Sequence, residues 1–161
     1  MTFTACSFTG HRIIDSAAMP RLGELIDRAL DYLYEHGCRD FYNGGAIGFD
    51  ILAARRVILF RMSHSDVRLH MILPCRNQTE RWSHSDVDAY EHVLRSADTV
   101  EYLSDLYYDG CMRERNARLV ELCDVLVAYV GRTSGGSAQT LRMTKTAGKT
   151  VYNLFAQANG R

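Results

Sequence analysis

Short apolar runs alternate along the chain with longer segments whose apolar residues recur at helical spacing. The runs predict strands near residues 3–8, 41–42, 67–73, 99–103, 125–130 and 150–155. The spacing predicts helices between Pro20 and Gly37, over 49–62, through 87–97, over 112–123 and after the glycines at 135–136. Asn77 with Glu80 resembles a capping pair at the start of the third of these helices. The alternation predicts an α/β fold, a Rossmann-like three-layer sandwich with a mostly parallel central sheet.

The clearest strand is the continuous apolar run Val125–Val130, as expected for a parallel strand covered on both faces. No linker or low-complexity tract interrupts the 161 residues, so we expect a single domain over 1–161. The five cysteines show no metal-ligand spacing, and no stretch resembles a signal peptide or a membrane span. These features predict a cytoplasmic protein with reduced thiols and no metal, cofactor or membrane contact.

The formal net charge is zero, with 19 basic and 19 acidic residues. A balanced charge provides no overall basic field for nucleic acid and disfavours such a partner. All but two of the 19 basic residues are Arg, whose planar donors suit phosphate and carboxylate groups.

Unusual residues gather where the predicted strands end. In open α/β sheets, ligands bind beyond the carboxyl ends of the strands. Those ends carry Gly10-His11-Arg12, Asn43-Gly44-Gly45, Pro74-Cys75-Arg76 and Gly131–Ser137, whereas the opposite connections carry no comparable cluster. This asymmetry predicts a ligand site at one edge of the sheet.

The loop Gly135-Gly136-Ser137 follows the clearest strand and precedes a helix. Glycine lets a ligand approach the backbone closely, and a helix N-terminus attracts phosphate. Ser137 either adds a hydroxyl to that site or serves as the helix N-cap. The placement favours phosphate binding.

The run Asn43–Asp50 is the second glycine loop. Asp50 starts a predicted helix, where its carboxylate either accepts hydrogen bonds from ribose hydroxyls or stabilises the helix N-terminus. The loop matches neither the dinucleotide fingerprint nor the P-loop pattern, which disfavours standard dehydrogenases and P-loop NTPases.

Single side chains add further candidates. Arg12 is placed to clamp a phosphate, and His11 either donates to the ligand or shapes the turn. Asn116 falls on an apolar stripe, so we expect it to be buried with a definite partner. Trp82 either stacks on a base or serves as a packing residue.

Several ordered motifs together resemble the SLOG superfamily, in the branch typified by YpsA and related prophage proteins. The motifs are Phe8–Arg12, Asn43–Asp50 with Leu52-Ala53-Ala54, Leu73–Gln78, Arg115-Asn116 with Asp124, and Gly135–Thr140. The ligand-binding residues expected from these segments are Thr9, Gly10, His11, Arg12, Asn43, Gly44, Gly45, Gly48, Asp50, Arg76, Arg115, Asn116, Gly135, Gly136 and Ser137.

The resemblance implies a Rossmannoid fold that binds nucleotides or molecules derived from them. Some members of the superfamily sense ligands of the ADP-ribose type, phosphoribohydrolases cleave nucleotide N-glycosidic bonds, and a DNA-processing branch binds single-stranded DNA. The resemblance leaves open whether the chain forms a homo-oligomer and whether its gene is cellular or of prophage origin.

One departure from the superfamily bears on catalysis. The phosphoribohydrolase motif Pro-Gly-Gly-x-Gly-Thr-x-x-Glu ends in a catalytic Glu, whereas this chain continues Thr140-Leu141-Arg142. Glycosidic chemistry needs carboxylates, and Asp50 or Glu114 would have to replace the missing acid. We therefore expect a module that senses or sequesters a phosphate-bearing nucleotide-type small molecule. An N-glycosidase with Asp50 as its candidate catalytic residue is the alternative, and single-stranded DNA handling is less favoured.

Overall fold

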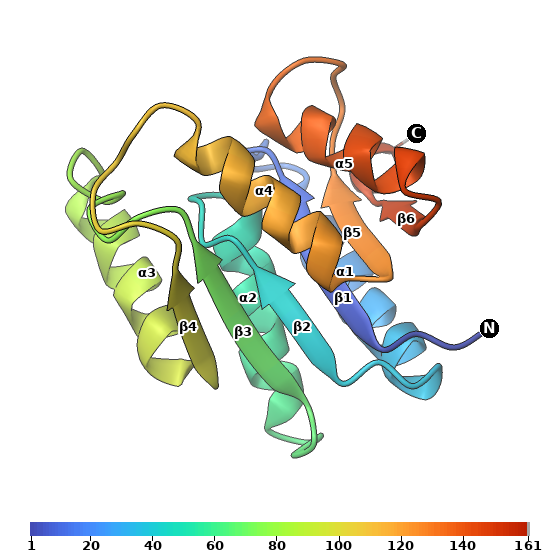
Figure 1. Cartoon of the computed structure of the whole chain (residues 1–161). Helices are drawn as coiled ribbons and strands as arrows, with labels where there is room; N and C mark the ends of the chain where they lie inside the picture. Colours follow the sequence, from blue (N-terminus) through green and yellow to red (C-terminus); the bar gives the residue numbers. More distant parts are fainter. Residues whose placement is uncertain (161) are drawn as a thin grey trace.

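The computed structural model describes residues 1–160 and has one six-stranded sheet at its centre (Figure 1). Every strand pairs in parallel with its neighbours, in the order β4-β3-β2-β1-β5-β6. The strands are β1 (Ala5–Gly10), β2 (Asp40–Asn43), β3 (Arg68–Leu73), β4 (Thr99–Tyr102), β5 (Val125–Tyr129) and β6 (Thr150–Asn153). The predicted α/β class with a parallel central sheet is confirmed.

Helices cover both faces of the sheet and give three layers (Figure 1). They are α1 (Met19–Glu35), α2 (Phe49–Arg61), α3 (His84–Ser96), α4 (Cys111–Leu122), α5 (Gly136–Thr146) and the short α6 (Phe155–Ala158). One layer contains α6, α1, α2 and α3, and each of these helices packs against the next in that spatial order. In the other layer α4 packs beside α5. The predicted three-layer sandwich is confirmed.

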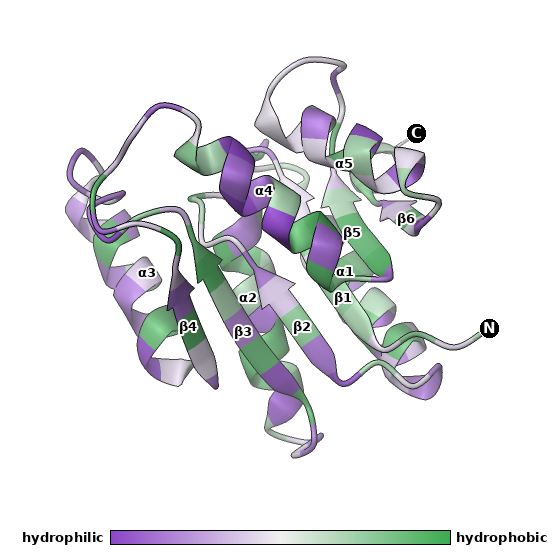
Figure 2. Cartoon of the chain, in the orientation of Figure 1, coloured by the Kyte–Doolittle hydropathy of each residue, from purple (hydrophilic) through white to green (hydrophobic). Residues whose placement is uncertain are grey.

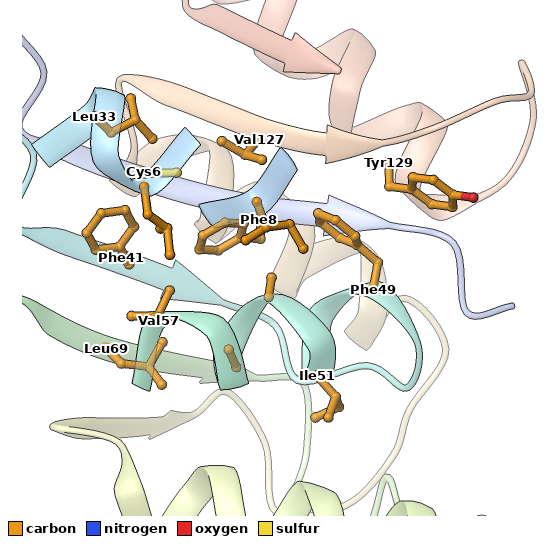
Figure 3. Close-up of a cluster of buried hydrophobic side chains, with 14 of the residues drawn as sticks. Cys6, Phe8, Leu33, Phe41, Phe49, Ile51, Val57, Leu69, Val127 and Tyr129 are labelled. Atoms are coloured by element: carbon orange, nitrogen blue, oxygen red, sulfur yellow. The ribbon is translucent and has the colours of Figure 1, made fainter. Parts of the chain in front are cut away.

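The larger hydrophobic core lies between the sheet and the layer of α1 and α2 (Figure 3). Phe8 of β1 packs between Phe41 of β2 and Phe49 of α2, with ring centroids 6.1 and 6.4 Å away. A smaller core under α5 contains Leu126 and Ala128 of β5. Because β5 contributes to both cores, all of its residues are buried, as the apolar run predicted. Figure 2 shows the apolar character of this strand in green.

The strand order reverses next to β1. The chain passes from β1 through α1 to β2 on one side, and later returns through α4 to β5 on the other side. The carboxyl ends of β1 and β5 therefore diverge into loops that leave a crevice between them, the usual ligand position in such sheets.

Three details differ from the sequence prediction. α3 begins at His84, where the N-cap Ser83 accepts a hydrogen bond from the Asp86 amide at 3.2 Å, so the capping role of Asn77 and Glu80 is wrong. The last strand ends at Asn153, and Phe155 is the first residue of α6, whose N-cap is Leu154. The Asn153 side chain accepts a hydrogen bond from the Phe155 amide at 3.2 Å. β1 extends to Gly10 through its pairing with β5.

Candidate functional site

A cavity of about 320 Å³ lies at the reversal point, beyond the carboxyl ends of β1 and β5. Its walls come from the loops after β1, β2 and β5 and from the first turns of α2, α4 and α5. The lining residues are Thr9, Gly10, His11, Arg12, Ala46, Asp50, Met112, Arg115, Asn116, Arg132, Gly136 and Ser137. Most residues that the sequence marked as ligand-binding thus meet at one place.

His11 connects two loops of the site. Its Nε2 lies 2.8 Å from the Gly131 amide, which can only donate, so Nε2 is the acceptor and the proton of the neutral ring is on Nδ1. Partial burial, together with the nearby charge of Arg132, lowers the pKa of His11 and favours this neutral form. Nδ1 lies 3.4 Å from the Ser137 hydroxyl. His11 therefore shapes the turn and presents a donor to the cavity wall.

Most of the glycines predicted to bind a ligand are required by the fold itself, because a side chain would collide with neighbouring atoms or because the backbone has a positive φ. A Cβ on Gly10 would lie 2.5 Å from the Phe49 ring, and one on Gly48 would lie 2.3 Å from the Arg12 carbonyl oxygen. Gly45 has a φ of +71°. At Gly136, by contrast, a Cβ would meet only the Asn116 amide nitrogen at 3.5 Å, an ordinary contact. The absence of a side chain at Gly136 therefore leaves space in the cavity.

The loop after β2 is braced by Asn43, which is fully buried. Its Nδ2 donates to the Asp50 carbonyl at 2.8 Å, and its Oδ1 accepts from the Gly45 amide at 2.9 Å. Asn43 supports the shape of the loop and does not line the cavity.

Arg115 and Asn116 are both buried in the first half of α4, each 6% exposed. Arg115 donates to the Gly44 carbonyl through Nη1 at 2.6 Å and to Asn116 Oδ1 through Nε at 2.8 Å. A Cβ on Gly44 would lie 2.8 Å from the Arg115 side chain, so this glycine admits the guanidinium. The expectation of a buried Asn116 with a definite partner is confirmed.

Asp50 is the one side chain of residues 1–160 with a buried oxygen lacking a hydrogen-bond partner. Its Oδ2 accepts from the Ala46 amide at 3.2 Å, and Oδ1 has no partner, although the residue is 5% exposed and lines the cavity. Burial raises the pKa of Asp50 to about 6, against the opposing charges of Arg115 and Arg12. A buried polar atom of this kind normally has a partner, and a ligand donor would supply it.

The raised pKa of Asp50 predicts a specific pH dependence of stability. The folded state prefers the protonated acid, so its stability increases as pH falls through about 6 toward the unfolded value near 3.8. Between pH 7.5 and 5 the wild type should gain on the order of 1 kcal/mol relative to Asp50→Asn. Urea unfolding of both proteins across this range measures the gain. Parallel pH profiles would contradict the assignment.

Other predicted residues lie outside the cavity wall. Arg76 pairs with Asp105 at 3.0 Å, and its guanidinium lies 4.1 Å from the centre of the Tyr102 ring. Gly135 precedes α5 with a φ of +98° and is its N-cap, so the N-cap alternative for Ser137 is wrong. Ser137 lies in the first turn of α5 instead.

The sequence prediction missed three lining residues, Ala46, Met112 and Arg132. Arg132 lies in the loop between β5 and α5, and its position within the loop 131–137 was the available signal. Ala46 and Met112 carried no distinguishing pattern.

No group of His, Cys, Asp or Glu side chains within residues 1–160 is arranged to hold a metal ion. No helix in the same range has the length and apolar character needed to cross a membrane.

Comparison with known families identifies the class of protein. The family model YpsA, described as the YspA SLOG family, matches residues 14–156. The chain therefore belongs to the YpsA-type SLOG family, which confirms the resemblance of its motifs. A UPF0398 protein of Bacillus velezensis is 24% identical over 147 residues, covering 87% of this chain and 81% of the relative.

Solved structures show the same fold at low sequence identity. DNA processing protein A of Streptococcus pneumoniae superposes with a TM-score of 0.66 at 13% identity, over 94% of this chain and 50% of that protein. The Helicobacter pylori protein of the same name, described for its single-stranded DNA binding mode, gives a TM-score of 0.64 at 17% identity. That match covers 93% of this chain and 64% of the Helicobacter protein. The chain thus corresponds to only part of each DNA processing protein.

Proposed function

We propose that this protein binds a phosphate-bearing, nucleotide-derived small molecule at the carboxyl ends of its strands, as a sensing or sequestering module. The observation that carries the proposal is the cavity at the reversal point, which is lined by cationic groups and by Asp50, a residue whose buried Oδ1 has no hydrogen-bond partner. Its volume of about 320 Å³ is at the lower end of ligand pockets.

The phosphate would occupy the side of the cavity formed by α5. Gly136 and Ser137 line it at the start of this 11-residue helix, where backbone amides and the helix dipole favour an anion. Arg12 and Arg132 line the same cavity and are exposed, so their guanidinium groups are free to turn toward the ligand.

The sugar would occupy the opposite side, next to Asp50. A ribose hydroxyl that donates to Oδ1 would satisfy the unpartnered oxygen. Membership of the SLOG family supports a nucleotide-type ligand. A ligand of the ADP-ribose type fits this description because it combines phosphates with ribose hydroxyls.

The test is a graded enlargement of the side chain at residue 136. Gly136→Val should weaken the binding of ADP-ribose and AMP by at least about 10-fold, because its methyl groups fill the space proposed for the phosphate. Gly136→Ala should weaken it less, since the added Cβ meets only an ordinary contact. Isothermal titration calorimetry measures affinity, and thermal unfolding checks that both variants fold. Wild-type affinity in Gly136→Val would refute the phosphate assignment.

A nucleotide N-glycosidase or phosphoribohydrolase-like enzyme is the second candidate, favoured by the environment of Asp50. A buried carboxyl group with a pKa of about 6 is suited to proton transfer near neutral pH. Release of free base from AMP that is lost in Asp50→Asn would support turnover. Tight binding without base release would support the sensing module.

Single-stranded DNA handling is a weaker candidate. The Helicobacter DNA processing protein has this property by its description and shares the fold, whereas the zero net charge of this chain disfavours it. DNA binding would show as an affinity that falls steeply with added salt.

A further inference from the structure

A second and larger cavity of about 640 Å³ adjoins the first. Its lining residues are Arg12, Ile47, Asn77, Gln78, Glu80, Arg81, Trp82, Tyr107 and Met112. Arg12 and Met112 line both cavities, so they form a shared wall. We refer to the second space as the outer cavity.

Two aromatic side chains give the outer cavity rigid, flat surfaces. Trp82 is half-buried and packs edge-on against Tyr90, with centroids 5.2 Å apart at 81°, which fixes the orientation of the indole. Tyr107 is 56% exposed, and its backbone amide is held by Asn77 Oδ1 at 2.8 Å. Aromatic groups that line a cavity and are held in place are suited to stacking against a planar ring.

The side-chain amides of Asn77 and Gln78 line the same cavity, and each has one polar atom that makes no hydrogen bond within residues 1–160. Gln78 donates through Nε2 to the Tyr90 hydroxyl at 3.0 Å, which leaves its Oε1 as an acceptor. Asn77 uses Oδ1 on the Tyr107 amide, which leaves its Nδ2 as a donor. An acceptor and a donor on neighbouring residues match the edge of a nucleobase.

Arg12 lies between the two cavities and lines both of them. Its side chain is exposed and takes part in none of the ion pairs formed among residues 1–160. A ligand that extends from one cavity to the other would pass this guanidinium, where a phosphate or ribose oxygen would accept from it.

We infer that the outer cavity is the base subsite, in which Trp82 and Tyr107 hold the heterocyclic base of the ligand whose phosphate occupies the inner cavity. The inference rests on the proposed function, because it extends the same ligand across the shared wall. It assigns to Trp82 a stacking role against the base, because this side chain lines the outer cavity.

Trp82 is the only tryptophan of the chain, so tryptophan emission, excited at a wavelength where the nine tyrosines do not absorb, reports this cavity alone. AMP and ribose 5-phosphate differ only by the base and form a matched pair of probes. AMP should bind about 10-fold more tightly than ribose 5-phosphate, since one stacked base contributes affinity of this order. AMP should also quench the Trp82 emission, whereas ribose 5-phosphate should bind without quenching it.

Variants of one loop provide the control. Tyr107→Ala should reduce AMP affinity about 5-fold or more and leave ribose 5-phosphate affinity unchanged. Leu106→Ala removes a neighbouring side chain that is 68% exposed and does not line the outer cavity, and it should change neither affinity.

The possible outcomes separate the two proposals. Equal affinities for AMP and ribose 5-phosphate, with unchanged Trp82 emission, would overturn the base subsite and leave the phosphate site standing. Failure of both probes to bind at millimolar concentration would overturn both. Preferential AMP binding with quenching, weakened selectively by Tyr107→Ala, would support the assignment.

Discussion

Gly48→Ala should lower the melting temperature by about 10 °C or more. Gly48 has a φ of +84° and a ψ of −123°, a region that is essentially restricted to glycine, and imposing it on alanine costs about 1–3 kcal/mol. The new Cβ would also lie 2.3 Å from the Arg12 carbonyl oxygen, which is backbone and cannot turn away. Relieving that overlap adds a cost of similar size, so about 4 kcal/mol is lost in total.

Gly48 connects the packing of α2 with the shape of the candidate site. Without a side chain at Gly48, the start of α2 lies against the loop after β1, and the Phe49 amide donates to the His11 carbonyl at 3.1 Å. Any shift that accommodates a Cβ must move His11 and Arg12, which line the cavity. A variant that still folds should therefore also bind AMP more weakly.

Gly23→Ala is the matched control. Gly23 lies within α1, and a Cβ there would meet nothing within 4 Å. The substitution should raise stability by about 0.5–1 kcal/mol, because alanine loses less backbone entropy in a helix. Differential scanning calorimetry of both variants makes the comparison. A melting temperature for Gly48→Ala within 2 °C of wild type corresponds to a loss of about 1 kcal/mol or less. That result would show that the backbone of His11 and Arg12 can move to accommodate the new Cβ at little cost.

The sequence was sufficient to predict the alternation of strands and helices, because strands such as β5 are short apolar runs and helices such as α1 have a periodic apolar face. It did not predict the strand order. β5 is apolar throughout, so its pattern shows burial on both faces without showing which strands flank it. The start of α3 was misplaced because Asn77 and Ser83 are both good capping residues, and only tertiary contacts assign Asn77 to the Tyr107 amide.

The position of the candidate site at the strand ends was predictable from the sequence. The roles of the individual residues within the site were not. Gly48 and Gly136 have the same chemical character in the sequence, yet one avoids a backbone collision and the other leaves open space. In the sequence, nothing distinguishes the three neighbouring arginines Arg113, Arg115 and Arg118 from one another. In the structure, only Arg115 is buried. The distinction depends on which face of α4 meets the loop at Gly44, a tertiary property.

Arg115→Met should cost about 3 kcal/mol of unfolding free energy at pH 7.5. The substitution removes the charge-assisted hydrogen bonds to the Gly44 carbonyl and to Asn116 Oδ1, and it leaves buried Asp50 with Arg12 as its remaining nearby positive charge. Arg118→Met is the control on the same helix. Arg118 pairs with Glu101 and Glu121 at 3.4 and 3.0 Å with a side chain that is 35% exposed, so its loss should cost less than about 1 kcal/mol.

The pH dependence of the Arg115→Met defect separates its two causes. At pH 5, below the Asp50 pKa of about 6, the acid is protonated in the folded state with or without Arg115, so the charge contribution disappears. The loss should therefore be smaller at pH 5 than at pH 7.5, and the loss that remains at pH 5 reports the hydrogen bonds of Arg115 to Gly44 and Asn116. Adding Asp50→Asn to Arg115→Met should recover part of the stability at pH 7.5 and little at pH 5, because only the higher pH has a buried negative charge to remove. Urea unfolding of the single and double variants at both pH values measures these differences. Equal losses at the two pH values would show that Arg115 stabilises the fold through its hydrogen bonds to Gly44 and Asn116, without an electrostatic link to Asp50.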